Sequence, residues 1–315
     1  MRKMKIINWG IGQRKKNITP SVAALGNFDG IHLGHIKVLN EAKFLSKKLN
    51  LPLSVLTFDP HPREFFQTEK NFFLLQNFNQ KKECLKKLGI QKIINLKFDN
   101  LLSDLKPETF VTKILSETLN IKHVFTGKDF KFGKNRSGNI ETLVKVGKKC
   151  NIDVYYSEIK IVNKQLISSS IIRESLRKGD VQNANNLLGR PYSISGKVIK
   201  GDQRGRTIGF PTANIKLGNV IRPAFGVYSV LVKDENNNEY KGIANIGRRP
   251  TVNDRGELIE VNLFDREINL YDKELEIFLH HFIRTEQKFG NIDELKKQIS
   301  KDVVKAKSLL GIESF

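Results

Sequence analysis

The chain of 315 residues is long enough for two domains, because single hydrophobic cores usually stop growing somewhat below this length. Its 39% hydrophobic and 28% charged residues are spread without a long apolar run, which excludes a disordered or membrane-spanning protein. The basic N-terminus lacks the apolar core of a signal peptide, so we expect a cytoplasmic protein with no membrane partner.

The formal net charge of +21 allows two interpretations. A nucleic-acid-binding protein would use such an excess of Lys and Arg to neutralise phosphates. The alternative is a general residue bias, because Lys, Asn and Ile are abundant along the whole chain and no long tract is purely basic. We favour the residue bias and expect no nucleic-acid partner, although a positive field also attracts small phosphate substrates.

Up to about residue 160, short runs typical of strands alternate with amphipathic segments, as in α/β proteins. Between the first two strands, apolar residues recur at helical spacing over residues 38–49. This rhythm predicts a doubly wound, mostly parallel sheet whose ligands bind at the carboxyl ends of the strands. The predicted strands are 22–27, 53–58, 92–98, 123–126 and 153–157, and further helices are predicted at 80–88, 107–119 and 140–149.

The segment GNFDGIHLGH, residues 26–35, lies between the first predicted strand and the first helix. Taken alone it could be a metal site, a phosphate-binding loop or a turn with nothing bound. His32 and His35 are three apart and can face one point, but two histidines are too few for a zinc site. Cys84 and Cys150 add no ligands, since neither has a Cys or His at zinc spacing. A phosphate fits better, because a helix start offers unpaired N–H groups.

The rhythm changes near residue 189. A helical stretch ends at Gly189, and Pro191 blocks its continuation. Closely spaced strands with turn-rich connections follow, which is the pattern of an antiparallel barrel or sandwich with a terminal helix. The predicted strands are 193–200, 227–233, 240–246, 258–264 and 275–282, and the helix is predicted at 292–310.

A second glycine-rich segment, GDQRGRTIGFPTANI, spans residues 201–215. Gly201, Gly205 and Gly209 make it flexible, and Arg204 and Arg206 make it basic, which suits a cover over phosphates. It lacks the G-K-[ST] of a Walker loop, and a barrel hairpin with turn glycines is the alternative.

Family resemblance adds to this interpretation of the first half. H-L-G-H resembles the H-x-G-H motif of nucleotidylyltransferases, and GNFDGIHLGH is similar to the form found in prokaryotic bifunctional FAD synthetases. TFDPHP (57–62), GKDFKFGKNRSGN (127–139) and ISSSIIR (167–173) match the same family in order, with Ser170 in place of the usual threonine.

The second half resembles riboflavin kinases. GFPTAN (209–214) is similar to the signature of that family, and FGVYSV (225–230), NIGRRPT (245–251), IEVNLFD (259–265) and FIRTEQKF (282–289) also match. Two positions depart from the pattern: Asn262 stands where the family usually has His, and Asp272 replaces the glycine of Y-G-K.

The resemblance implies an enzyme that phosphorylates riboflavin to FMN and adenylylates FMN to FAD, with ATP as substrate at both sites and Mg2+. It implies a Rossmann-like nucleotidylyltransferase domain over residues 1–188 and an antiparallel riboflavin-kinase β-barrel over 189–315. An alternative keeps only the adenylyl transfer and makes the barrel a flavin-binding or regulatory module.

The resemblance also implies site residues. His32, His35 and Arg173 would serve adenylyl transfer, and Glu260 would be the general base of the kinase. Thr212 and Asn214 would hold the magnesium. Asp129, Phe130 and Phe132 would line the flavin or adenine, although both Phe residues could equally be core. The implied binding residues are Gly26, Asn27, Phe28, Asp29, Gly30, Gly34, His61, Asp129, Ser168, Ser169 and Ser170 at the first site, and Gly201, Arg206, Gly209, Thr212, Asn214 and Arg284 at the second.

Overall fold

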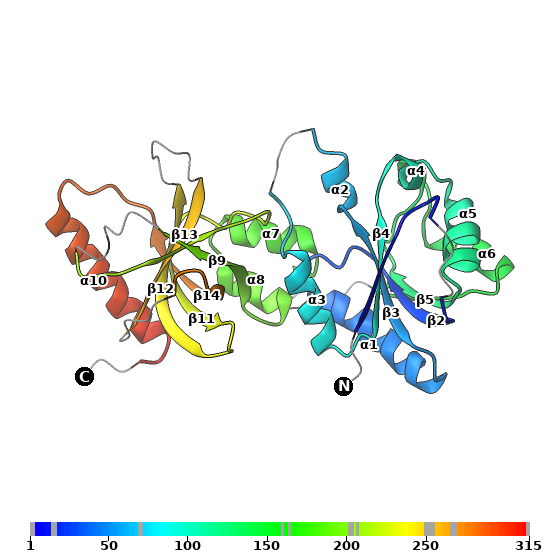
Figure 1. The fold of residues 1–315 in the computed structure, drawn as a ribbon, viewed down its shortest axis with the longest axis horizontal. Coiled ribbons are helices and arrows are strands. Elements are labelled where there is room, and N and C mark those ends of the chain that lie inside the picture. Colours follow the sequence, from blue (N-terminus) through cyan, green and yellow to red (C-terminus); the bar gives the residue numbers. More distant parts are fainter. Residues whose placement is uncertain are drawn as a thin grey trace. The chain divides into compact units, whose positions relative to one another are not determined.

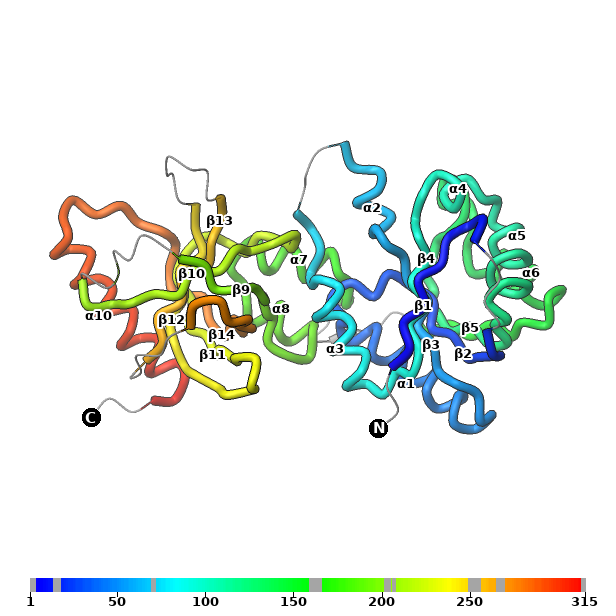
Figure 2. Tube along the Cα trace, viewed as in Figure 1, coloured from blue at the N-terminus to red at the C-terminus, as the bar shows by residue number. Residues whose placement is uncertain are grey.

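The computed structural model describes residues 4–13, 18–68, 72–158, 161–162, 165–200, 205, 208–248, 256–264 and 270–312. The chain divides into two compact units (Figures 1 and 2). The first unit comprises Met1–Asn71 and Phe78–Ile167, and the second comprises Phe72–Asn77 and Ser168–Phe315. Within the described part of the chain, every helix is too short or too polar to span a bilayer.

The first unit is built on a six-stranded parallel sheet with the order β1-β4-β3-β2-β5-β6, which confirms the predicted fold class. The chain moves from β2 through β3 and β4 to one side, then returns to β5 on the other side of β2. The order therefore reverses between β2 and β5, where open parallel sheets bind ligands. The strands are β1 (Lys5–Trp9), β2 (Ser21–Leu25), β3 (Leu53–Asp59), β4 (Lys92–Lys97), β5 (Ile121–Gly127) and β6 (Asp153–Ser157).

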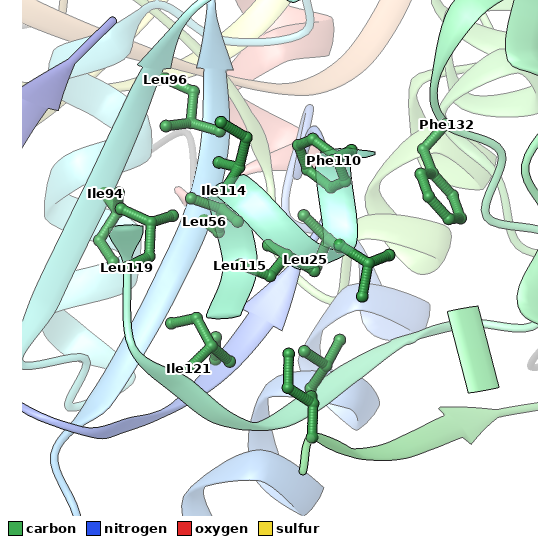
Figure 3. Close-up of a cluster of buried hydrophobic side chains, with 14 of the residues drawn as sticks. Leu25, Leu56, Ile94, Leu96, Phe110, Ile114, Leu115, Leu119, Ile121 and Phe132 are labelled. Atoms are coloured by element: carbon green, nitrogen blue, oxygen red, sulfur yellow. The ribbon is translucent and has the colours of Figure 1, made fainter. Parts of the chain in front are cut away.

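Helices cover both faces of this sheet, which is why its inner strands are apolar on both sides. One face packs on α1, and the other packs on η1 and α6, where Leu25, Ile94 and Leu115 share the cluster drawn in Figure 3. The predicted helix at 107–119 is α5 followed by a π-helix, η1, a difference that apolar spacing over nine residues does not reveal. The elements are α1 (Leu33–Lys48), α2 (Pro62–Phe65), α3 (Phe78–Lys87), α4 (Asn100–Ser103), α5 (Pro107–Thr109), η1 (Phe110–Thr118), η2 (Lys134–Arg136) and α6 (Ile140–Lys149), with a hairpin of β7 (Ile161–Val162) and β8 (Gln165–Leu166).

The second unit contains a closed antiparallel barrel with the order β10-β13-β12-β11-β14-β9, which resolves the barrel-or-sandwich alternative in favour of the barrel. Two helices precede it, and the second ends at Gly189, whose φ of 72° gives the left-handed cap expected of glycine. The elements are α7 (Ser169–Arg177), α8 (Val181–Leu188), β9 (Tyr192–Ile199), β10 (Ala213–Lys216), β11 (Gly226–Asp234), β12 (Glu239–Arg248), β13 (Glu257–Leu263), β14 (Glu274–Thr285) and α10 (Ile292–Leu309).

Helix α10 packs against the outer wall of the barrel (Figure 1), and its Ala306 shares a buried hydrophobic cluster with Val227 and Ile243. A buried ion pair holds it there. The Arg284 side chain on β14 donates from Nε and Nη2 to the carboxylate of Asp302, at 2.9 and 2.8 Å from Oδ2. Asp302 is only 4% exposed, so the pair is largely shielded from water.

We expect Asp302→Ala to lower the free energy of unfolding by about 3–5 kcal/mol, because it leaves the Arg284 charge without its buried partner. Urea denaturation followed by circular dichroism measures the change. Lys305→Ala, at an exposed position of the same helix, is the control and should have little effect. Equal stability of the two variants would contradict a structural role for the pair.

Candidate functional sites

The first candidate site lies at the carboxyl end of β2, beside the point where the strand order reverses. Residues 26–32 form the loop between β2 and α1. TFDPHP closes the neighbouring strand β3, and GKDF closes β5 on the other side. Three of the sequence motifs therefore meet at one edge of the sheet.

The two histidines of this loop pack directly on each other. Their rings are stacked with centroids 3.6 Å apart, and the Phe28 ring meets that of His35 edge-on. His32 caps α1, because its Nδ1 accepts a hydrogen bond of 3.3 Å from the His35 backbone N–H. A neutral imidazole that accepts at Nδ1 carries its proton on Nε2, so His32 presents a donor at that atom.

Gly34 keeps this pair in place. A Cβ at position 34 would lie 3.1 Å from both Nδ1 and Cε1 of His32, which is tighter than ordinary contact. The glycine of H-x-G-H is therefore needed for ring packing. The same Cβ would lie 4.0 Å from the carbonyl oxygen of Ile167, the residue directly before the ISSSIIR serines.

The remaining first-unit residues lie at the same edge of the sheet. Asp29 is buried in the loop, and His61 caps α2 by accepting from the Arg63 backbone N–H. Asp129 is exposed just after β5, with a carboxylate oxygen over the Cα of Gly127. Phe132 is buried in the core and Phe130 stacks on it half-buried, so the core interpretation holds for Phe132.

The ISSSIIR residues after Ile167 belong to the second unit. Ser168 caps α7 by accepting from the Ile171 backbone N–H, and Ser169 and Ser170 form its first turn. Arg173 is 6% exposed, and its Nε donates to the carbonyl oxygen of Phe73 at 2.7 Å. Phe73 thus orients the guanidinium group.

The second candidate site is a row of residues across the barrel wall. The strand register aligns Asn214 on β10 with Glu260 on β13, and Glu260 with Asn245 on β12. Asn245 is in turn aligned with Val227 on β11, and Val227 with Arg284 on β14. Aligned residues share one face of a sheet with Cβ atoms about 5 Å apart. Glu260, Asn214 and Arg284 are therefore on the same outer face.

The polar groups of this row are partly enclosed. Asn214 is 4% exposed, and no described residue forms a hydrogen bond with its buried Oδ1. Glu260 is half-buried and Arg284 is held by Asp302. An amide oxygen buried without a donor suits a cation, since hard metal ions prefer oxygen ligands.

The GFPTAN segment is fixed just outside the row. A Cβ on Gly205 would lie 2.3 Å from the carbonyl oxygen of Phe210, so only glycine fits there. The Asn262 side chain donates to the carbonyl oxygen of Pro211 at 2.7 Å, next to Thr212. Asn262 thus ties β13 to this segment, although the family usually has His here. Gly209 is exposed with a φ of 86°, and Gly201, Arg204 and Arg206 lie outside the described residues.

Two residues of these sites were not predicted as site residues from the sequence. Lys81 on α3 is 8% exposed and donates to the carbonyl oxygen of Asn27. Its only sequence signal is a lysine four residues before the buried Leu85, on the apolar side of α3. Asn245 stands beside Glu260 and donates to Glu286, and only the quoted motif NIGRRPT contained it.

Comparison with protein families gives two matches, one in each half of the chain. Residues 14–171 match the family described as FAD synthetase, and residues 188–310 match the family described as riboflavin kinase.

Curated relatives cover nearly the whole chain. A bifunctional riboflavin kinase/FMN adenylyltransferase of Haemophilus influenzae is 40% identical over 96% of this chain and 98% of its own length. The Bacillus subtilis protein of the same name is 41% identical, covering 91% and 92%. A crystal structure described as a macrolide-efflux protein from Streptococcus pneumoniae is 31% identical, with a TM-score of 0.82 over 94% of this chain and 97% of that chain.

Proposed function

The chain belongs to the bifunctional riboflavin kinase/FMN adenylyltransferase family, and from this premise we propose how its own residues carry the two reactions. Riboflavin and ATP give FMN in the second half of the chain, and FMN and a second ATP give FAD and pyrophosphate in the first half. We assign the first reaction to residues 189–315 and the second to residues 1–188.

In the kinase reaction, the primary hydroxyl of riboflavin attacks the γ-phosphate of ATP. Glu260 accepts the hydroxyl proton as the bond to phosphorus forms, and ADP leaves as the bond from the γ-phosphorus to the bridging oxygen breaks. Asn214 stands directly opposite Glu260 in the strand register. The ATP phosphates that bind near Asn214 and the base Glu260 are therefore on one face of the barrel. Arg206, Gly201 and Gly209 belong to the segment that covers the phosphates. Arg284, at the β14 end of the row, contributes to binding the flavin.

In the adenylyl transfer, a phosphate oxygen of FMN attacks the α-phosphorus of ATP, and pyrophosphate leaves without a covalent enzyme intermediate. The protein supplies position and charge stabilisation. His32 and His35 donate to the ATP phosphates at the start of α1, where the helix dipole also favours negative charge. Arg173 and the serines at 168–170 bind the leaving pyrophosphate. His61 at the end of β3 and Asp129 at the end of β5 contribute to binding the substrates, ATP and FMN.

We propose Mg2+ as the metal of the kinase, held by the Asn214 side-chain oxygen and the Thr212 hydroxyl together with ATP phosphates. The buried Oδ1 of Asn214, which accepts from no described residue, fits such a ligand. When bound, the ion would offset the charge of the phosphate oxygens. Both reactions consume ATP, which supports a cytoplasmic protein.

The observation that carries the kinase assignment is the cross-strand alignment of Glu260 with Asn214 and Asn245. A carboxylate on an exposed strand face would be solvated, and its position would indicate no catalytic role. Here it is half-buried between two amide side chains, beside the GFPTAN segment. That setting suits a base that must receive one proton from a positioned hydroxyl.

Glu260→Gln should lower the kcat of FMN formation by about a hundredfold or more, because the amide cannot accept the proton. FAD formation from supplied FMN should stay unchanged, since it occurs in the other half of the chain. Chromatographic assays of the two products measure both rates. Glu274→Gln, at an exposed position of β14, is the control, and an unaffected kinase in Glu260→Gln would contradict the assignment.

His32→Asn separates the donor role of His32 from its capping role, because asparagine also caps helices well. We expect adenylyl transfer to lose about a hundredfold in kcat, as when an oxyanion donor is removed. FMN formation should be normal. His123→Ala, in the same unit, is the comparison. Adenylyl transfer at the wild-type rate in His32→Asn would show that the imidazole is not required.

Asn214→Ala should raise the Mg2+ concentration needed for half-maximal FMN formation by at least about tenfold, because it removes an oxygen ligand. A magnesium titration at saturating ATP measures this, and FAD formation from FMN in the same protein is the internal control. An unchanged magnesium requirement would exclude Asn214 as a ligand.

A further inference from the structure

The loop between β2 and α1 has a strained backbone. Phe28 and Ile31 have φ values of 48° and 41°, although neither is glycine and isoleucine is β-branched. Left-handed conformations are unfavourable for such residues and persist only where the surroundings enforce them. Both side chains are buried, at 2% and 1% exposure, in the cluster that α1 covers. The loop therefore needs anchors besides its own sequence.

One carbonyl group receives two of these anchors. The oxygen of Asn27 accepts a hydrogen bond of 3.2 Å from the Thr57 hydroxyl on β3 and one of 2.9 Å from Lys81 Nζ on α3. Asn27 directly precedes the first left-handed residue, so fixing its carbonyl fixes the peptide that enters the turn. Five residues later the chain reaches His32.

Lys81 is unusual for a lysine whose hydrogen bond, among the described residues, is to a backbone carbonyl group. It is 8% exposed and lies one helical turn before Leu85, which is in the core cluster. Burial lowers the pKa of its ammonium group from the ordinary value, while Asp29 and Asp59 act to raise it. Burying a charge costs several kcal/mol, so an apolar residue would serve packing better.

We propose that Lys81 is a positioning residue for adenylyl transfer: its ammonium group holds the Asn27 carbonyl and thereby fixes the loop that presents His32 and His35. Asp29 and Asp59 oppose the effect of burial on the pKa of this group. A charged donor makes a stronger hydrogen bond than a neutral one. Thr57 is the second, neutral donor to the same oxygen. This inference rests on the proposed assignment of His32 and His35 to ATP.

Lys81→Met tests the proposal in the full-length enzyme, because methionine retains most of the side-chain length and favours helix. The Asn27 oxygen keeps its bond from Thr57, so the fold should be retained. Trp9, the single tryptophan, is buried in the first unit, and its fluorescence reports whether that unit is folded. Lys86→Met, the same change at an exposed position of α3, is the matched control.

We expect Lys81→Met to lower the kcat of FAD formation from FMN at least tenfold, with the KM values for ATP and FMN within threefold of wild type. Fluorescence, FMN formation and the Lys86→Met rates should be unchanged. Thr57→Val should show the same pattern, because it releases the same carbonyl. Lys81→Arg keeps the charge and should recover part of the rate.

Three results would overturn the proposal. The first is an unchanged kcat in Lys81→Met. The second is a higher KM for ATP at normal kcat, which would make Lys81 a nucleotide ligand. The third is a loss that follows the fraction of unfolded protein. If wild-type protein and His32→Asn form FAD at equal rates, the assignment of the histidines fails instead, and the two failures are thus distinguishable.

Discussion

A slip of one residue between β10 and β13 would turn Glu260 into the apolar interior of the barrel and Ile259 toward its outer face. Strand register is thus the constraint on which the second site depends. It is fixed by Ile259 and Val261, the buried neighbours of Glu260, which are almost fully enclosed and alternate with the polar residues. Hydrophobic burial therefore decides which carboxylate lies on the outer face beside the GFPTAN segment. The Arg284–Asp302 pair then fixes α10 at the other end of the same row.

The first site depends on a different arrangement, a loop at the point where the strand order of a parallel sheet reverses. Here the side chains are brought together by backbone conformation. Gly34 allows the two imidazoles to stack, and the left-handed residues Phe28 and Ile31 turn the chain toward the start of α1. The left-handed backbone of this loop is unfavourable, so the loop needs support from other elements. The hydrogen-bond donors to the Asn27 carbonyl come from β3 and α3, which are distant in sequence. The two candidate sites are thus held in different ways, one by the strand register of a barrel wall and the other by hydrogen bonds to a loop.

Both folds could be predicted from the sequence. Buried parallel strands are recognised as apolar runs, and barrel strands as short, closely spaced segments in which apolar and polar residues alternate. Edge strand β1 was missed, since its alternation is short and lies in a basic N-terminal segment. Strand β10 was missed because Pro211 and Thr212 made its start resemble a loop. Motif matching found His32, His35, Glu260 and Asn214 in chemically sensible places. It could not find Lys81 and gave Asn245 no role, because both depend on which elements become neighbours in three dimensions. It also could not decide between core and binding site for Phe132, which burial assigns to the core.

The central claim is that one chain carries two separate sites that act in sequence on the same flavin. The most direct measurement is to incubate the purified protein with riboflavin, ATP and Mg2+ and to separate the flavins by chromatography over time. The account predicts that FMN appears first and that FAD accumulates as FMN is consumed. Protein that binds ATP but converts neither riboflavin to FMN nor supplied FMN to FAD would contradict it.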